Sequence, residues 1–373
     1  MPTSRFSGFS LTACLWLLVI GGAIAVQAQT RSYVAHPGDG LITVLDTQTN
    51  AVVDKITVCT DHTCTPLIPA VTPNGARIYV TNVSQNTVTV IDTLTNTVID
   101  TITVGQAPWG IAITPDGNRA YVANTSGTIS VIDTATNTVT ATITDSDGPS
   151  GVAITPDGAR AYVSNGQGTV SVVDTGTNTI LTNIPITDFP VPCCGFPAFS
   201  LVAIALTPDG SRGYVVSAST GKTYVIDTAT NSMIATILTN PGQPLSIAMK
   251  PDGTRVYTAS VGFQARAFVI DTASNTILAT ISAGGAPPFV GVTPDGTKFY
   301  IDGDMAVTII DTATNTISTR IQLDLTMGGV AFGTLPEVPQ RKEDCKDSGF
   351  QRFSALAFRN QGQCVKYVTE HAH

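Results

Sequence analysis

Charged side chains are scarce in this chain, and glutamate is almost missing. Only 12% of the 373 residues are charged, and the three glutamates, Glu337, Glu343 and Glu370, lie close to the C-terminus. Of the four histidines, two stand in the last three residues. The chain has no Gly-x-Ser-x-Gly elbow, no His-Glu-x-x-His and no phosphate-binding glycine loop. An enzyme built on this chain would have few acids and bases to use.

Positive charge is also in deficit. Lys and Arg number 19 against 27 Asp and Glu, which gives a net charge of −8. Nucleic-acid binding rests on basic side chains that neutralise phosphates, so DNA and RNA are poor partners for this chain. After residue 30 no long stretch shows a 3.6-residue apolar period, and few helices are expected.

The first 28 residues have the pattern of a secretory signal peptide. Arg5 supplies the positive start, residues 11–26 are apolar, and residues 26–28 resemble a cleavage site. A retained membrane anchor is the alternative, but this run of about 16 residues is shorter than the roughly 20 that span a bilayer. Residues 11–14 also resemble a lipoprotein box, although they precede the apolar run. We expect an exported protein (periplasmic, cell-surface or secreted) without a stable membrane span after leader removal.

What the chain does contain is a repeat. The clearest copy, residues 131–139, reads Val-Ile-Asp-Thr-Ala-Thr-Asn-Thr-Val. Its aspartate occurs seven times, at steps of 46, 41, 41, 53, 44 and 40 residues. The positions are Asp46, Asp92, Asp133, Asp174, Asp227, Asp271 and Asp311. A period near 40, filled with Val, Ile and Thr, is typical of a propeller blade.

The unit from residue 110 to residue 149 predicts four antiparallel strands. Apolar or alternating segments cover residues 111–113, 119–124, 128–133 and 138–144, and Pro-Asp-Gly, Thr-Ser-Gly and Asp-Thr-Ala-Thr-Asn segments separate them. Pro and Gly preset the φ angles of the turns, and Asp accepts hydrogen bonds from the backbone ahead of it. Four such strands make one blade.

The two ends of the repeat array are complementary. The chain enters the array at a second strand, residues 32–34, and residues 329–332 match the missing first strand. We therefore predict an all-β, seven-bladed propeller over residues 29–335, closed by its C-terminal strand, which removes the open sheet edges. A linker over residues 336–344 and a small cysteine-containing tail over residues 345–373 follow.

The segments Tyr79-Val80-Thr81-Asn82 and Tyr121-Val122-Ala123-Asn124, with the Asp-Thr-x-Thr-Asn turns, resemble the YVTN-type seven-bladed β-propellers of exported and cell-surface proteins. The similarity covers residues 31–334. It implies the fold, whereas the function stays open, because such propellers include binding scaffolds, surface-layer-like proteins and a few enzymes. The tail resembles a short C-K-x-G-G-[WF]…F-x-N-Q-G-x-C-V module of exported bacterial proteins, with Ser348 in place of the first glycine.

The mature chain has six cysteines in three sequence-local pairs, which suits disulfides in an oxidising compartment. The pairs are Cys59 with Cys64, Cys193 with Cys194, and Cys345 with Cys364. Zinc binding is the alternative for the last pair, with His371 and His373, and metal binding is the alternative for the first, with His62. The adjacent pair fits a strained vicinal disulfide, a redox pair or two separate partners.

Strand alternation divides the loops between two faces. One face carries the Pro-Asp-Gly and Asp-Thr-x-Thr-Asn turns, and a basic residue follows each Pro-Asp/Asn-Gly turn at a fixed offset. These six are Arg77, Arg119, Arg160, Arg212, Arg255 and Lys298. We interpret them as solvated turn residues, with local ion pairs of small value.

The opposite face carries the second-to-third-strand hairpins and the connections between blades, where the copies diverge and repeat proteins usually bind. Both long insertions fall there. The residues that follow each tyrosine by three positions form a predicted ring: His36, Asn82, Asn124, Asn165, Ser217, Ser260 and Gly303. Turn formation is the alternative role of its asparagines.

Acids and aromatic residues also gather on this second face. The acids are Asp39, Asp61, Asp145, Asp147, Asp188, Asp302, Asp304 and Asp324. Such an acidic mouth predicts attraction of a basic partner or of a divalent cation such as calcium, although acids also keep exported proteins soluble. The aromatic residues include Trp109, Phe196 and Phe289, which suit protein or glycan contact or else fix the insertions to the propeller.

We therefore expect an exported binding scaffold whose partner is a protein or a cell-envelope component, with no resident cofactor. The alternative is a propeller enzyme with lactonase-like or metal-assisted lyase or hydrolase chemistry. No catalytic residue can be named, because no base and electrophile can be placed together from the repeat pattern.

Overall fold

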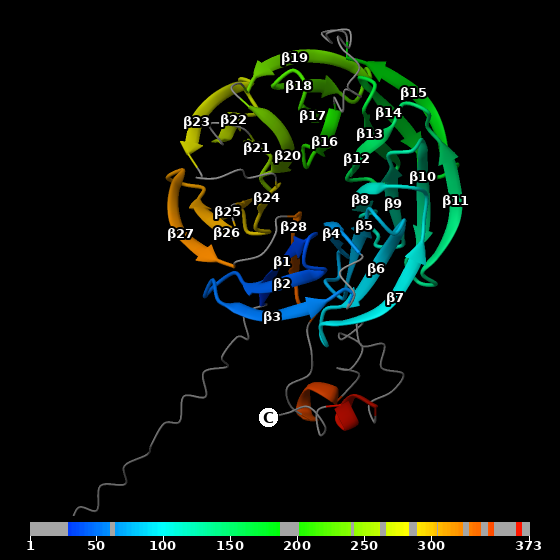
Figure 1. Ribbon diagram of the computed structural model, residues 1–373, viewed down its shortest axis with the longest axis vertical. Helices are drawn as coiled ribbons and strands as arrows, with labels where there is room; N and C mark the ends of the chain where they lie inside the picture. Colours follow the sequence, from blue (N-terminus) through cyan, green and yellow to red (C-terminus); the bar gives the residue numbers. More distant parts are fainter. Residues whose placement is uncertain are drawn as a thin grey trace, which may run out of the picture.

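The protein is an all-β ring of seven four-stranded antiparallel sheets (Figure 1). The computed structural model describes residues 29–59, 64–186, 201–239, 242–261, 266–282, 289–303, 305–323, 328–336, 342–346 and 363–367. Each sheet is one blade, whose first strand lies nearest the ring axis and whose last strand lies on the rim. The predicted seven-bladed propeller is confirmed.

The strands of a blade follow one another in the chain from the axis to the rim, except that the innermost strand of blade 1 is the last of the array. Blade 1 contains β28 (Val330–Thr334), β1 (Thr30–His36), β2 (Leu41–Asp46) and β3 (Val52–Thr57), and blade 2 contains β4 (Pro66–Val71), β5 (Arg77–Asn82), β6 (Thr87–Asp92) and β7 (Thr97–Thr103). Blade 3 contains β8 (Pro108–Ile113), β9 (Arg119–Asn124), β10 (Thr128–Asp133) and β11 (Thr138–Thr144), and blade 4 contains β12 (Pro149–Ile154), β13 (Arg160–Asn165), β14 (Thr169–Asp174) and β15 (Thr179–Pro185). Blade 5 contains β16 (Leu201–Leu206), β17 (Arg212–Ser217), β18 (Lys222–Asp227) and β19 (Ser232–Leu238), and blade 6 contains β20 (Gln243–Met249), β21 (Arg255–Val261), β22 (Arg266–Asp271) and β23 (Thr276–Ser282). Blade 7 contains β24 (Phe289–Val292), β25 (Lys298–Gly303), β26 (Ala306–Asp311) and β27 (Thr316–Gln322).

The core lies between neighbouring blades. Second and third strands are buried along most of their length, and the tyrosine of every second strand is fully buried. Tyr121, for example, packs in one cluster with Val131 of its own blade and with Val163 and Val173 of the next. Each blade thus buries both faces, which explains why its inner strands are rich in Val, Ile and Ala.

The C-terminal strand closes the ring, as the sequence predicts. β28 pairs antiparallel with β1, from Thr30 opposite Thr334 to Val34 opposite Val330. The N–H of Leu335 then donates to the carbonyl of Gln29, at 2.9 Å. First and last strands therefore complete one sheet, and the ring has no open junction between its ends.

The basic residues after the Pro-Asp/Asn-Gly turns link the blades, so their interpretation as solvated turn residues is wrong. Arg119 Nη1 donates to the Thr175 carbonyl of the next blade at 2.5 Å, and the hydroxyl of Tyr121 donates to Asn178 Oδ1 at 2.7 Å. Equivalent bonds run from blade 2 to blade 3 through Arg77 and from blade 7 back to blade 1 through Lys298. The Asp-Thr-x-Thr-Asn turn is thus the acceptor for the preceding blade.

The contribution of these inter-blade bonds to stability can be tested with a matched pair of Tyr→Phe substitutions. Tyr121→Phe removes the hydroxyl that bonds to Thr175 and Asn178 of the next blade and leaves the Asn178 amide oxygen without its donor, so we expect a loss of about 1–2 kcal/mol in unfolding free energy. Tyr257 occupies the same position in blade 6, but its hydroxyl makes no bond to blade 7. Tyr257→Phe should therefore be close to neutral by urea denaturation. Equal losses at both positions would contradict this role for the hydroxyl.

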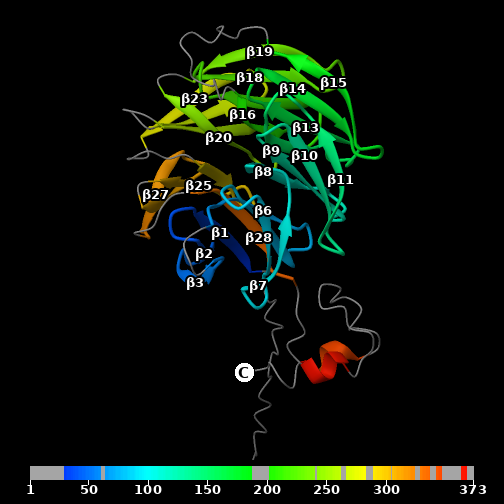
Figure 2. The ribbon, with the colours of Figure 1, turned by 45° about the vertical axis from the view of Figure 1, so that its right-hand side comes forward.

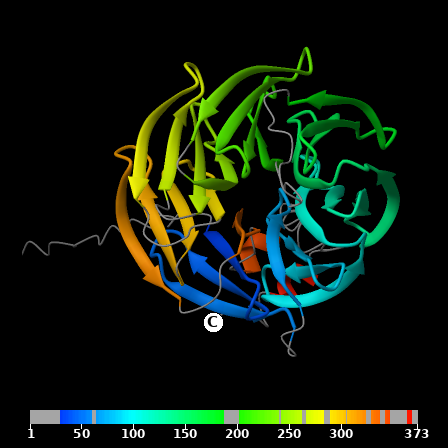
Figure 3. The ribbon, with the colours of Figure 1, turned by 45° about the horizontal axis from the view of Figure 1, so that its top comes forward.

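The described tail segments lie outside the propeller ring in Figure 2, and in the view of Figure 3 they lie behind it, overlapping the blue and cyan blades. A 3₁₀ helix, Lys342–Cys345, is joined to a helical turn over residues 363–367 by a disulfide between Cys345 and Cys364, with Cα atoms 5.7 Å apart. Burial raises the pKa of Tyr367, and the negative charge of Asp92 adds to the rise. Tyr367 is therefore within electrostatic range of the Asp-Thr-x-Thr-Asn turn of blade 2.

Candidate functional site

The strand topology separates two faces of the ring. The turn face carries the connections from first to second and from third to fourth strands, and the loop face carries the second-to-third-strand hairpins and the inter-blade connections. On the turn face, Asp133 Oδ1 accepts the backbone N–H groups of Ala135 and Thr136, which lowers the pKa of Asp133. The repeated aspartates are therefore turn residues, in which Oδ1 is occupied by hydrogen bonds within the turn.

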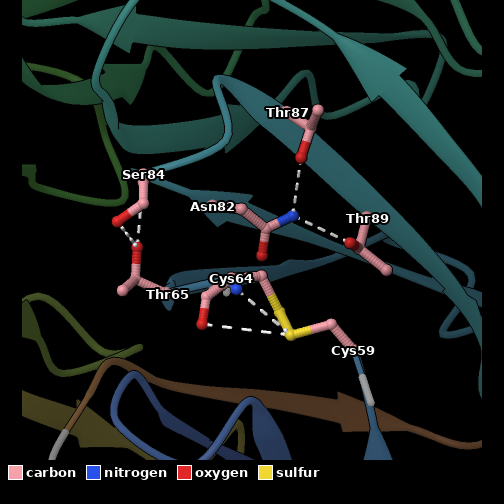
Figure 4. The surroundings of a disulfide bond; sticks show 7 residues. All are labelled: Cys59, Cys64, Thr65, Asn82, Ser84, Thr87 and Thr89. Atoms are coloured by element: carbon pink, nitrogen blue, oxygen red, sulfur yellow. Dashed lines mark hydrogen bonds between the residues drawn. A yellow bond between two sulfur atoms is a disulfide. The ribbon is translucent and has the colours of Figure 1, made fainter. Parts of the chain in front are cut away.

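On the loop face, a disulfide closes the first insertion (Figure 4). Cys59 and Cys64 are bonded with their Cα atoms 6.1 Å apart, and the N–H of Cys64 donates to Cys59 Sγ at 3.3 Å. The chain then passes the hydroxyl pair of Thr65 and Ser84, which lie 2.9 Å apart. This pairing replaces the metal interpretation of these two cysteines.

The side chains that were predicted to form a ring of contact residues on the loop face are buried. His36, Asn82, Asn124 and Asn165 are at most 1% exposed. The amide group of Asn82 donates to Thr87 and Thr89 of the neighbouring strand, at 3.0 and 2.8 Å, and His36 Nε2 lies 2.9 Å from Thr43 Oγ1. These side chains support the hairpins from inside, so they do not form an exposed contact surface.

Two of the loop-face acids are also buried. Asp145 is 3% exposed and Asp302 is 2% exposed, whereas Asp147 is half-buried. Burial raises the pKa of Asp145 and raises that of Asp302 to about 8. A buried carboxyl offers little charge to a macromolecular partner, so the acidic mouth cannot rest on these two residues.

Asp302 lies where the ring closes. Its Oδ2 accepts the N–H of Gly328 at 3.0 Å, just before β28, and it stands on β25 of blade 7. The same position, two residues after the tyrosine, is Ala35 in blade 1 and Ala123 in blade 3. The carboxyl thus joins the last blade to the first.

A cavity of about 160 Å³ lies on the ring axis, lined by the first strands of all seven blades. Trp109 of β8 and Phe289 of β24 line it, at the loop-face ends of their strands. Trp109 is half-buried, Phe289 is 7% exposed, and the carbonyl of Trp109 accepts the hydroxyl of Thr81 at 2.8 Å. The aromatic residues therefore line a hollow at the centre of the scaffold.

Small residues let the first strands around this cavity pack closely: a Cβ on Gly110 would lie 2.3 Å from the Ser150 carbonyl oxygen, and one on Gly151 would lie 2.8 Å from Ala203 Cα. These residues were not among those predicted from the sequence. When the blades are aligned on the tyrosine, one first-strand position reads Ile68, Gly110, Gly151, Ala203, Ser246, Phe289 and Gly329, and all seven line the cavity. Five of these are Gly, Ala or Ser, where a first strand otherwise favours Val or Ile. In the sequence, this recurrence of small residues at one first-strand position is the pattern that could have identified the residues around the ring axis.

Several predicted site residues lie outside the described residues. They are Asp61, His62, Asp188, Cys193, Cys194, Phe196, Asp304 and Asp324. Among the residues that are described, no three His, Cys, Asp or Glu side chains gather as a metal-ligand group. Within the same residues, no helix is long and apolar enough to cross a membrane.

Comparison with known proteins supports the architecture. No protein-family model and no curated protein sequence match the chain. A Kuenenia stuttgartiensis hydrazine synthase chain is similar, with a TM-score of 0.66 and 26% identity over 75% of this chain and 92% of that one. A functionally unknown protein from Desulfotomaculum acetoxidans DSM 771 has a TM-score of 0.66 and 17% identity, covering 82% and 99% of the two chains.

A third similar structure is the dihydro-heme d1 dehydrogenase NirN in complex with DHE, with a TM-score of 0.59 and 16% identity. The match covers 81% of this chain and 74% of that one. At 16–17% identity, the last two structures support the fold alone. The YVTN-type resemblance and the tail module stay predictions. The chain is a seven-bladed β-propeller of four-stranded blades, closed by its own C-terminal strand.

Proposed function

We propose that this protein is an exported binding scaffold that holds a protein or cell-envelope component on its loop face. The cavity lined by Trp109 and Phe289 is the anchor point for an apolar group of that partner. Export is supported by the signal-like leader and by two disulfides, which persist in oxidising compartments.

The observation that carries this proposal is the contrast between the two faces. On the turn face, the repeated Asp, Thr, Asn and Arg side chains are engaged in bonds within and between blades. At the loop-face end of the axis, the side chains of the described lining are apolar apart from the Ser246 hydroxyl, and backbone groups supply the rest of its polar surface. A hollow that offers apolar side chains and backbone polar groups on a rigid scaffold suits binding, and an aromatic residue at its edge is a typical energetic centre of an interface.

The residues that line the axial cavity favour binding over the enzyme alternative. Proton transfer needs an ionisable group within hydrogen-bond reach of the substrate. The lining residues that the structure describes offer none, and Asp145 and Asp302 lie at blade seams. Binding is therefore the better-supported function.

The test uses Trp109, the single tryptophan left after leader removal, because the other is Trp16. Capture from an exported fraction, followed by titration of each purified candidate, should change the fluorescence of Trp109. Trp109→Ala should weaken binding at least about tenfold, a typical loss for an interface aromatic anchor. Ile99→Ala, which truncates a 47% exposed residue on the rim, is the matched control and should bind normally. Equal binding by both variants would remove the cavity from the interface.

A further inference from the structure

Asp145 is an acid at a buried position that other blades fill with uncharged residues. In the six blades where the structure describes it, the residue after the fourth strand donates its N–H to the second-to-third-strand hairpin, and Asp145 does so to the Gly127 carbonyl at 3.0 Å. The residues that make the same bond elsewhere are Val58, Val104, Ile186, Thr239 and Leu323. Desolvating a carboxylate here has an energetic cost that the apolar residues avoid.

The surroundings of Asp145 form one ordered network across the seam of blades 3 and 4. Asn165 Nδ2 donates to the hydroxyls of Thr169 and Ser171, at 2.9 and 2.7 Å. Thr169 donates to Asp147 Oδ2 at 2.8 Å. Burial raises the pKa of Asp145, and the nearby side chains of Ser171 and Asn165 partly oppose that rise. Because the Thr169 hydroxyl donates its one hydrogen to a carboxylate, it can only accept a bond from Asn165. The Asn165 side chain must therefore orient its nitrogen, and not its oxygen, toward the hydroxyls.

Two oxygen atoms of this network have no donor. Asp145 Oδ2 and Asn165 Oδ1 are buried and make no hydrogen bond, although their residues are 3% and 0% exposed. The equivalent oxygens of Asn82 and Asn124 also lack a partner, so an asparagine oxygen without a hydrogen bond recurs in several blades and does not by itself mark a site. Among the described residues, Asp145 Oδ2 is the one buried carboxylate oxygen without a hydrogen bond, and the second carboxylate, that of Asp147, lies close enough to act on it.

We propose that Asp145, Asp147 and Asn165 bind a calcium ion at the seam of blades 3 and 4, on the loop face. Calcium takes carboxylate and amide oxygens as ligands and accepts irregular, partly hydrated sites, whereas magnesium demands a near-ideal octahedron. The ion would neutralise both carboxylates, whose mutual repulsion otherwise adds to the cost of burial. This site does not depend on the proposed partner binding.

Thermal melting of the full mature protein in calcium chloride and in chelator tests the site. We expect calcium, well above its dissociation constant, to raise the melting temperature of the wild type by roughly 3–5 °C, with one ion bound by calorimetric titration. Asp145→Val installs the residue of equivalent blades. It should lose the calcium shift and should melt higher than the wild type in chelator, because it removes the buried charge.

Asp39→Asn is the control, since Asp39 is an acid of the same face in the hairpin between β1 and β2 and should keep the full shift. If Asp145→Val does not fold, Asp147→Asn replaces it and should also lose the shift. Identical melting of the wild type in calcium and in chelator would overturn the proposal. A calcium shift that persists in the Asp145 or Asp147 variant would overturn it as well.

Discussion

Replacing Gly75 with alanine is expected to loosen the closure of the ring and to destabilise the protein by at least about 3 kcal/mol, with backbone displacement as the cause. Gly75 lies in the first turn of blade 2, with φ at +70°. A Cβ placed on it would lie 1.7 Å from the carbonyl oxygen of Thr334, the last residue of the closing strand. No rotamer change relieves a clash with backbone, so the strand or the turn must move.

Gly117 is the matched control, because it is the same glycine in blade 3. Its φ is +75°, and the nearest atom to its would-be Cβ is Pro73 Cδ at 3.4 Å, an ordinary contact. Alanine at either site carries the strain of a positive φ, about 1 kcal/mol, but only Gly75→Ala displaces the end of β28. Urea unfolding measures the difference, and hydrogen exchange of residues 330–334 should rise in Gly75→Ala alone. Similar losses from both variants would mean that the closing strand tolerates the change.

Asp302→Asn is expected to stabilise the protein increasingly as the pH rises. Burial raises the pKa of Asp302 to about 8, from an ordinary value near 4. In the folded protein the neutral acid is therefore favoured, and its contribution to stability is complete below about pH 4. It is lost progressively between about pH 4 and pH 8, on the order of 5 kcal/mol at most, because ionisation then opposes folding.

The asparagine variant isolates this effect, because its amide oxygen can still accept the Gly328 N–H and carries no charge. Unfolding free energies of the two proteins should agree near pH 4 and diverge by several kcal/mol at pH 9, with the wild type less stable. Turn aspartates such as Asp133 act in the opposite direction. Their lowered pKa stabilises the fold above about pH 4, and that stability is lost in acid in both proteins. Parallel curves across the whole range would show that Asp302 is ionised at neutral pH.

The repeat pattern is sufficient to predict the architecture because its determinants are local. Alternating Val, Ile and Thr form strands, Pro-Asp-Gly fixes one turn, and the asparagine of Asp-Thr-x-Thr-Asn takes a positive φ, +54° at Asn137. The matching half-blades at the two ends predict the closing strand, and close spacing suits the bond between Cys59 and Cys64. Each of these inferences needs only residues within one blade or one short loop.

What the tertiary structure decided are the contacts between blades. Arg119 bonds to a carbonyl 56 residues away, and Asp302 is buried against a strand that begins 28 residues later. A repeat shows which residue types recur at each aligned position of a blade. It does not show which positions of the next blade those residues contact, because that depends on the angle and distance between neighbouring sheets. Hence the sequence alone suggested a solvated Arg119 and an exposed Asp145 and Asp302, and the close packing of small first-strand residues around the axis emerges only in the closed ring.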